Sequence, residues 1–503
     1  MRLRQPSNVQ RWLAGAGFVL LVALLLAGLR VLAARIVAGH LQNAADRQLA
    51  LVEGGQPLWQ WRLRQPHDLV AGRAFGAAMV RRDDGGLRVT SLDGTSFEIG
   101  LPVRGMLDPG HWPLLALHGE ADASFRLGLA WQPRLGQPGC FGWQDTPVAA
   151  GPLHVVVDLR RLHWQAADGN PCPPPQRIEM LRLKLLLPAR ASLGLDEVAL
   201  RRDAPLPTPV HPSLQLSPDP ATAKRQLADP ALPAAPWIAL PARASAETQL
   251  ALRQLVWRQR PGALILPHGK APTVKGTLDG HDQMAWVGTI GYLLVLAGLA
   301  LWPPPPQRRW LEPAACLAGP LWLVIGLQLG LRLSVPGLLV FAGALLFAAQ
   351  AEWRQRPGGW RWLGDWRAWS MPFALLPLAL LLVANGGGHF RAPATGHLLT
   401  YPLWAILQQW LMLAVVLRRL EGTRLQPALA VLLTALAFAL MHTPNGTLMQ
   451  LCLLAELWWA WCFRRSRALL PVAAAHAACA LLVEAGLAGG LLRSLEVSAR
   501  FFL

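Results

Sequence analysis

The C-terminal third of the chain sets a small group of polar side chains into otherwise apolar stretches. The group comprises Gln408, Gln409, His442, Asn445, Glu456, His476 and Glu484. A glutamate can activate water, a histidine can exchange a proton near neutral pH, and a glutamine amide can orient either group. Burying such side chains in hydrocarbon is costly unless they bond to one another. We therefore expect them to form a functional cluster.

Two of the histidines lie in spaced motifs. Phe438-x-x-x-His442 brings a ring and an imidazole onto one helical face, and His476 follows in "LLPVAAAHA" after a basic turn. With these motifs, residues 395–490 resemble the CPBP membrane proteases, named for CAAX processing and bacteriocin processing and also called CAAX-prenyl-protease-2-like proteins. The family pattern is Glu-Glu-x-x-x-Arg, then Phe-x-x-x-His, then a final His-x-x-x-Asn, each on a separate transmembrane helix. The resemblance implies an intramembrane endopeptidase in which a glutamate activates water while histidines orient it and stabilise the oxyanion.

The chain departs from the family pattern at the first and last motifs. Glutamines stand where the paired glutamates are expected, Leu413 replaces the arginine, and Ala480 replaces the final asparagine. A glutamine cannot accept the proton, and loss of a general base typically costs a factor of about 10² to 10⁴ in rate. Our catalytic candidates are His442, His476, Glu456, Gln408 and Gln409, and our substrate-binding candidates are Phe438 and Asn445.

Three hypotheses follow from these substitutions. In the first, the protein is a protease in which Glu456 or one of the two histidines replaces the missing base. In the second, it is a pseudoprotease that binds a membrane helix without cutting it. In the third, the polar cluster only joins helices, through hydrogen bonds of about 1 kcal/mol each, and an outer domain binds a glycan or another surface ligand.

No cofactor is expected. A zinc shell of His442, His476 and Glu456 is a weaker option, because the chain lacks a His-Glu-x-x-His motif that would fix the ligand spacing on one helix. The expected partners are the lipid bilayer and a membrane-anchored peptide or protein substrate.

Composition indicates a membrane protein. The chain has 503 residues, of which 53% are hydrophobic and only 15% are charged. The net charge of +18 does not indicate nucleic acid, because the arginines lie mainly beside apolar spans. The nine predicted transmembrane helices cover 12–29, 285–302, 311–331, 335–351, 369–385, 397–417, 426–442, 447–463 and 469–493.

The basic residues predict an orientation. Strict alternation puts Arg308/Arg309, Arg418/Arg419 and Arg464/Arg465 on the side of the N-terminus, which the positive-inside rule assigns to the cytoplasm. We therefore predict a multi-pass protein of a bacterial inner membrane with its large domain in the periplasm. At about 1.5 Å per residue, His442 and His476 lie at different depths in their spans. Either the spans begin elsewhere, the helices are staggered, or the two histidines do not meet.

Between the first and second spans, the hydrophobic period changes to two, which is typical of strands. The segment "LRVTSLDGTSFEIGLPV" predicts a β-hairpin around Asp93-Gly94, and several further strands predict an all-β sandwich. In an oxidising compartment, Cys140 and Cys172 would form a disulfide, with unbridged thiols as the alternative. Four tryptophans fit a hydrophobic core better than a carbohydrate-stacking platform: Trp112, Trp131, Trp143 and Trp164.

The predicted organisation has five parts. Residues 1–34 form a transmembrane anchor, 35–202 the periplasmic β-sandwich, and 203–284 a proline-rich linker with a short helix. Residues 285–394 carry transmembrane helices two to five, and 395–503 carry the CPBP-like helices six to nine.

Overall fold

The computed structural model describes residues 8–503, apart from 84, 104, 204–211, 234, 274–280, 306–307, 332–333, 355–358, 387–389 and 490–491. The chain divides into two compact units. One comprises Met1–Val37, Arg243–Leu250 and Leu278–Leu503, and the other comprises Ala38–Ala242 and Ala251–Thr277. Parts of the predicted anchor and of the predicted linker lie outside the described residues. We call the unit that contains Leu278–Leu503 the helical unit and the unit that contains Ala38–Ala242 the β unit.

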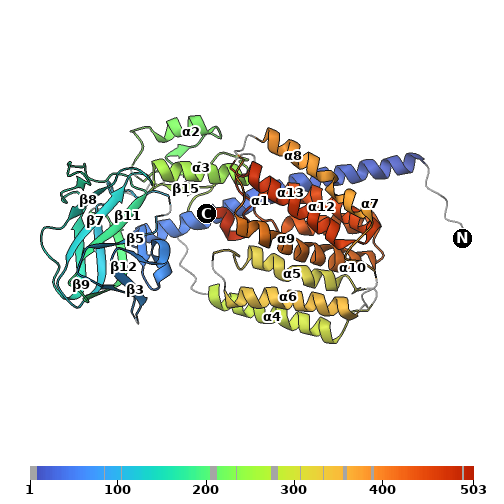
Figure 1. The fold of residues 1–503 in the computed structure, drawn as a ribbon. Coiled ribbons are helices and arrows are strands. Elements are labelled where there is room, and N and C mark those ends of the chain that lie inside the picture. The colour runs from blue at the N-terminus through green and yellow to red at the C-terminus, as the bar shows by residue number, and fades with distance from the viewer. Residues whose placement is uncertain are drawn as a thin grey trace. The chain divides into compact units, whose positions relative to one another are not determined.

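The helical unit is built from helices (Figure 1), most of which are apolar in sequence. They are α1 (Asn8–Glu53, whose last part belongs to the β unit), α4 (His281–Leu301), α5 (Leu311–Ile325), α6 (Val335–Arg354), α7 (Trp366–Ser370), α8 (Leu375–Asn385), α9 (Thr395–Gln409), α10 (Arg418–Glu421), α11 (Pro427–Leu440), α12 (Gly446–Ser466) and α13 (Leu469–Leu487). Six helical stretches of the described chain are long and apolar enough to cross a membrane, and α5 and α11 are shorter apolar helices. The protein is therefore a multi-pass membrane protein.

Each predicted span overlaps a helix, but two helices end earlier than predicted: α5 ends at Ile325 instead of residue 331, and α13 is also shorter. Helix α13 ends at Leu487, whereas the prediction continued to residue 493. Ala488 is extended and Gly489 has φ of +82°, a left-handed conformation that ends a helix readily at glycine. The apolar residues beyond this point belong to a separate C-terminal segment with a 3₁₀ turn at Ser498–Phe502.

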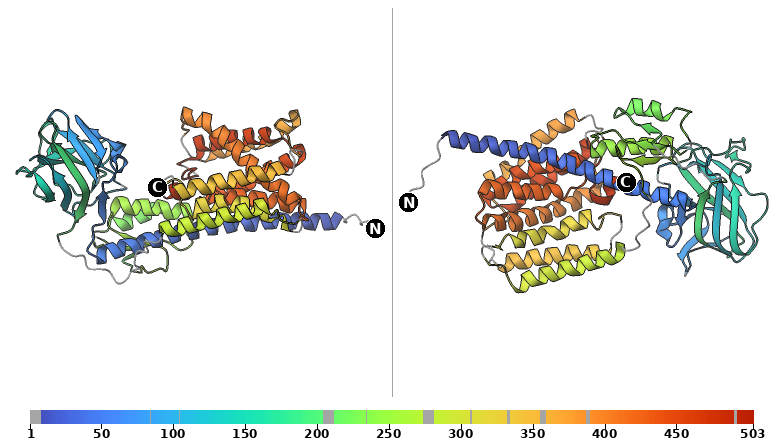
Figure 2. Two further views of the ribbon diagram at one scale, coloured as in Figure 1. Left: turned by 90° about the horizontal axis from the view of Figure 1, so that it is seen from below. Right: turned by 180° about the vertical axis from the view of Figure 1, so that it is seen from behind.

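Helices α9 to α13, drawn in orange to red in Figure 2, carry or flank the polar residues of the expected cluster. Helix α11 packs against α12, and α8 and α9 pack against α13. Between α9 and α10 the helix continues as a π-helix from Trp410 to Leu417. Such π-helical segments are rare in proteins, and those that occur are often at functional sites. Gln409 is the last α-helical residue before it.

One end of the helical unit is joined by ion pairs. Arg418 lies 2.6 Å from Glu352, which also accepts a hydrogen bond from the indole of Trp360 at 3.0 Å. Arg419 pairs with Glu312. Glu421 bonds to two arginines of the α12 end, Arg464 at 3.1 Å and Arg467 at 2.7 Å. The structure thus brings together basic groups that the sequence predicts on one side of the membrane.

The β unit contains two six-stranded antiparallel sheets (Figure 1). The first has the order β3 (Ala78–Arg82), β4 (Leu87–Ser91), β12 (Ser192–Arg201), β6 (Leu114–Ala121), β9 (Gly151–Asp158), with β1 (Trp59–Arg62) also on β12. The second has the order β10 (Gln165–Ala166), β8 (Cys140–Trp143), β7 (Arg126–Gln132), β11 (Met180–Leu186), β5 (Phe97–Leu101), β2 (Ala74–Phe75). One hydrophobic cluster takes in buried side chains of both sheets.

The hairpin predicted around Asp93-Gly94 is wrong. Strand β4 pairs with β3 and β12, whereas β5 pairs with β11 and β2 in the other sheet. The chain bends here, with Gly94 at φ of +83° and the Asp93 carboxylate accepting from the Thr95 amide at 2.8 Å. The Asp-Gly pair therefore lies at a bend in the chain, but this bend connects two sheets instead of two paired strands.

The tryptophans of the β unit lie mainly in its core. Trp112, Trp131 and Trp164 are 2%, 7% and 3% exposed, and only Trp143 is half-buried. They fill the core and do not form a platform, as the core interpretation expects. Strand β8 carries Cys140, which forms a disulfide with Cys172.

The interpretation of 203–284 as a linker with a short helix was incomplete. Its described residues include a three-stranded parallel sheet of β13 (Leu214–Gln215), β14 (Trp237–Ala239) and β15 (Leu264–Leu266), together with α2 (Pro220–Leu227) and α3 (Ala246–Gln259). The runs "WIAL" and "ALIL" are short enough to fit between prolines, and their side chains are buried. Proline has no N–H to donate to a sheet, but the prolines here lie outside the two runs, so the short strands between them can still pair.

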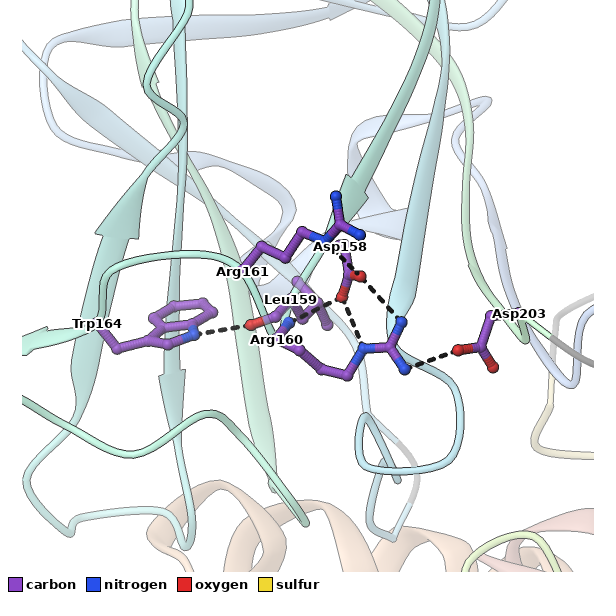
Figure 3. A network of polar contacts seen from close by, with 6 residues as sticks. All are labelled: Asp158, Leu159, Arg160, Arg161, Trp164 and Asp203. Carbon is purple, nitrogen blue, oxygen red and sulfur yellow. Dashed lines mark hydrogen bonds and ion pairs between the residues drawn. The ribbon is translucent and has the colours of Figure 1, made fainter.

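An exposed network holds the end of β9 (Figure 3). The guanidinium of Arg160 contacts Asp158 at 2.9 Å and Asp203 at 2.6 Å. These side-chain hydrogen bonds hold the pKa of both carboxyl groups below their ordinary values. Trp164 donates its indole N–H to the carbonyl of Leu159 in the same turn at 2.9 Å.

We expect the substitution Arg160→Gln to loosen β9 at pH 7. The pKa values of Asp158 and Asp203 are lower in the folded state than in the unfolded state. The stabilisation that their bonds to Arg160 give the folded state is therefore complete above the unfolded pKa near 3.9, and it is lost as the pH falls through the lower folded pKa values. Urea unfolding followed by pulsed hydrogen exchange on peptides covering Gly151–Asp158 measures the effect at pH 7 and at pH 3. The difference from wild type should shrink at pH 3. Arg161→Gln is the matched control, because the Arg161 side chain is 86% exposed and contacts Asp158 only at 3.5 Å.

Candidate active site

Gln409 joins three helices of the helical unit at one buried point. Its amide nitrogen lies 2.9 Å from a carboxylate oxygen of Glu456 on α12 and 3.2 Å from Nδ1 of His476 on α13. Gln409 and Glu456 are fully buried, and His476 is 4% exposed. An amide nitrogen carries two hydrogens, so it can donate to both partners at once. Three members of the cluster expected from the sequence therefore meet at this amide.

The two candidate histidines meet at the ring of Phe438. Its centroid lies 4.8 Å from that of His442 and 5.5 Å from that of His476. The indole of Trp459, one turn after Glu456 on α12, lies 5.0 Å from the imidazole of His476. Of the three alternatives left by the different depths of the histidines, the structure excludes the one in which they do not meet.

The hydrogen bonds at Nδ1 give the two neutral histidines opposite tautomers. Nδ1 of His442 lies 2.8 Å from the carbonyl oxygen of Phe438, which can only accept, so Nδ1 carries the proton and Nε2 a lone pair. Nδ1 of His476 faces the donating amide of Gln409, so it is the acceptor and Nε2 carries the proton. The site therefore offers one ring nitrogen that can accept a proton and one that can donate a hydrogen bond.

A cavity of about 790 Å³ lies beside the histidines. One face of α9 lines it, because His397, Tyr401, Trp404 and Gln408 recur at the helical period. His442 and His476 also line it, whereas Gln409 and Glu456 lie behind its wall. The remaining wall is mostly apolar. The cavity is large enough for a peptide segment with apolar side chains.

Asn445 has a different surrounding from the one expected of a substrate-binding residue. Its carbonyl oxygen accepts from the Leu448 amide at 3.2 Å and so caps the start of α12. Its amide nitrogen donates to the backbone carbonyls of Ser494 at 2.7 Å and Glu496 at 3.3 Å. Both of those residues line the cavity. Asn445 therefore fixes part of the wall and does not itself line the cavity.

A second group of polar residues lines the cavity. The sequence analysis named Glu484 from this group but not His397 or Tyr401. His397 lies 3.0 Å from the carboxylate of Glu484, and its ring lies 5.2 Å from that of Tyr401. Tyr401 in turn lies 6.1 Å from His476 between ring centroids. The spacing of His397, Tyr401 and Gln408 on α9 was the signal that could have identified this stripe.

Several acceptors of the cluster have no donor among the described residues. They are one side-chain oxygen each of Gln408, Gln409 and Glu456. Buried polar atoms of proteins are usually hydrogen-bonded. Of these three residues only Gln408 lines the cavity, so its oxygen is the one that a donor from a ligand could reach. Within the described chain, no group of three or more histidine, cysteine, aspartate or glutamate side chains is arranged to hold a metal ion. The zinc shell considered from the sequence has no geometric support here.

The fold defines a polytopic membrane protein with a buried polar cluster between helices. Residues 390–482 match the family model described as type II CAAX prenyl endopeptidase Rce1-like. This segment runs from just before α9 into α13 and contains Gln409, His442, Glu456 and His476, so the chain carries a CAAX-protease-like domain here. The resemblance to CPBP proteases is thereby confirmed for this part of the chain. No curated protein matches the chain.

We expect the substitution Gln409→Leu to destabilise the helical unit by about 1–3 kcal/mol, because it leaves Glu456 and His476 buried without their donor. Gln408→Leu is the matched control, and it should be nearly neutral because the Gln408 oxygen already lacks a partner. Adding Glu456→Leu to Gln409→Leu should recover part of the loss, since both members of the pair are then apolar. Thermal unfolding of the purified protein in detergent measures all three. Equal losses for the two single glutamine variants would contradict the role of Gln409.

Proposed function

We propose that the cavity is the active site of an intramembrane endopeptidase that cleaves membrane-anchored peptides or proteins. The observation that carries the proposal is the Gln409 amide, which links Glu456 to His476 beside a cavity that His442 also lines. The match of residues 390–482 to a protease family supports it. The chemistry must differ from the family pattern, because both glutamates of the first motif are glutamines.

In this proposal His442 is the general base. Its Nε2 lone pair takes a proton from the water that attacks the scissile carbonyl, while its Nδ1–H keeps donating a hydrogen bond to the Phe438 carbonyl oxygen. The Nε2–H of His476 donates to the oxyanion that develops on the attacked carbonyl. The protonated His442 then returns its proton to the leaving amine, and the peptide bond is broken without a change in the total charge.

Gln409 and Glu456 are positioning residues in this mechanism. Glu456 is fully buried and does not line the cavity, so its carboxylate acts on Gln409 rather than on water. Glu456 accepts a hydrogen bond from one N–H of the Gln409 amide, so the other N–H points to Nδ1 of His476. This second hydrogen bond selects the His476 tautomer that carries its proton on Nε2. The unpartnered oxygen of Gln408, which lines the cavity, is placed to accept from a backbone N–H of an extended substrate.

A second candidate function is substrate binding without cleavage. It is favoured by one specific observation, the replacement of both first-motif glutamates and of the arginine by Gln408, Gln409 and Leu413. In that case the cavity and its donors bind a membrane segment, and the histidines contribute hydrogen bonds only. The third hypothesis, in which the outer domain binds a glycan, retains no tryptophan platform to support it.

The finer placement of the chain is part of the proposal. We place it in a bacterial inner membrane with nine spans, with the N-terminus in the cytoplasm and the β unit as a periplasmic sandwich. The disulfide of Cys140 and Cys172 supports an oxidising compartment for the β unit. The arginines near Glu421 support a cytoplasmic location for that end of the bundle.

The test is cleavage of membrane-anchored reporter peptides by the purified full chain in liposomes. We expect His442→Ala and His476→Ala each to reduce the rate by about 10² to 10⁴, because each removes a group that acts on the reacting atoms. Glu456→Gln should cost much less, since a glutamine oxygen can still accept from Gln409. His67→Ala in the β unit is the control and should match wild type.

Other outcomes assign the alternatives. If Glu456→Gln is as inactive as His442→Ala, then Glu456 is the base and the assignment to His442 is wrong. If wild type is inert but Gln408→Glu cleaves, the protein is a binding pseudoprotease. If neither cleaves, and wild type also fails to bind the reporter peptides, the bundle is a scaffold.

A further inference from the structure

Two histidines face each other across neighbouring strands of the first sheet, far in sequence from the CAAX-protease-like domain. His118 of β6 is paired in register with His154 of β9. Their Nδ1 atoms are 3.0 Å apart, and the ring centroids are 5.0 Å apart at an interplanar angle of 73°. His154 is exposed and His118 is half-buried. This pair does not enter the proposed peptidase chemistry.

The separation of the two nitrogens fits the coordination of one metal ion. Imidazole nitrogens bind transition metals at about 2.0–2.1 Å. Two such nitrogens are therefore ~2.9 Å apart when they subtend a right angle at the ion, and ~3.4 Å apart at the tetrahedral angle. The observed 3.0 Å lies between these values. Both Nδ1 atoms can bind one ion if each imidazole carries its proton on Nε2.

The neighbouring strands extend the pair into a polar row. On β12, Glu197 is in register with His118, and on β1, Arg62 is in register with Glu197. Residues directly opposite one another in antiparallel strands share a face, with Cβ atoms about 4.5–5.5 Å apart. When Nδ1 of a histidine binds a metal, its Nε2–H usually donates to a carboxylate or carbonyl. Glu197 is the carboxylate that the sheet places beside His118.

We propose that His118 and His154 form a surface site for a divalent transition metal, with copper(II) bound more tightly than zinc(II). Copper(II) stands highest in the affinity order of divalent first-row ions and accepts nitrogen ligands at right angles. The described residues supply no group of three or more ligating side chains, so water completes the coordination. The alternative role of the pair, a hydrogen bond between two solvent-facing imidazoles, adds little to stability. The site is independent of the proposed peptidase function.

The test is titration of the purified full chain, without a histidine tag, with copper(II) chloride or zinc(II) chloride alone. Isothermal titration calorimetry gives the stoichiometry, and electron paramagnetic resonance of the copper sample reports the number of bound nitrogens. We expect one equivalent of copper(II) with two nitrogen ligands, and weaker binding of zinc(II). His118→Ala and His154→Ala should each weaken that equivalent at least tenfold, and Glu197→Gln should weaken it about tenfold. His163→Ala, an exposed histidine of the same unit, is the matched control.

The measurements separate the site from adventitious binding. Retention of the copper equivalent in the double variant His118→Ala/His154→Ala would overturn the proposal, as would an equal loss in His163→Ala. Circular dichroism of each variant checks that the sheets remain folded. His118→Gln, which keeps a polar side chain in the row but removes the imidazole, should lose the equivalent like His118→Ala; if it binds normally, the imidazole is not a ligand.

Discussion

A single amide group between three helices is the constraint on which the candidate site depends. In an apolar bundle, a carboxyl group and an imidazole are each expensive to bury, and neither can be left without a partner. The amide nitrogen of Gln409 satisfies both at once, because it presents two hydrogens in one plane. The helices that carry the carboxyl group and the imidazole are thereby held at a fixed separation, and the neighbouring aromatic rings of Phe438 and Trp459 fill the space around them.

The contact with Glu456 gives a physical reason for a glutamine at position 409, where the family pattern has a glutamate. A glutamate at position 409 would place two carboxyl groups within hydrogen-bonding distance of each other, and like charges at that distance cannot both ionise. A carboxyl group on α12 and an amide on α9 avoid this conflict. Residue 456 and residue 409 therefore form a complementary pair, in which the acid lies on a different helix from the one that carries it in the family pattern.

The sequence indicated which buried polar side chains lie together better than it indicated their geometry. Gln409, Glu456, His442 and His476 were recognisable because polar groups in apolar helices need partners, and this argument requires no coordinates. The roles of Asn445 and Gln408 were not predictable, because they depend on which side of a helix end or cavity wall the side chain lies. In the β unit, Asp93-Gly94 predicted a reversal, but turn chemistry is local and the choice of partner strand is set by the distant strands β3, β11 and β12.

Strand β12 of the β unit contains a β-bulge. The register of β12 against β6 shifts between Leu195 and Glu197, so Asp196 is an extra residue on that strand. The carbonyl of Asp196 accepts from the amide of Leu63 at 2.9 Å. Past the bulge, Val198 and Leu200 are buried, while Glu197 falls in the row of His118. Because the bulge absorbs the extra residue, Glu197, Val198 and Leu200 lie on the faces that an uninterrupted strand would give them. Loss of Asp196 would therefore leave these faces unchanged, whereas loss of a paired residue such as Val198 would reverse the faces of the residues that follow it.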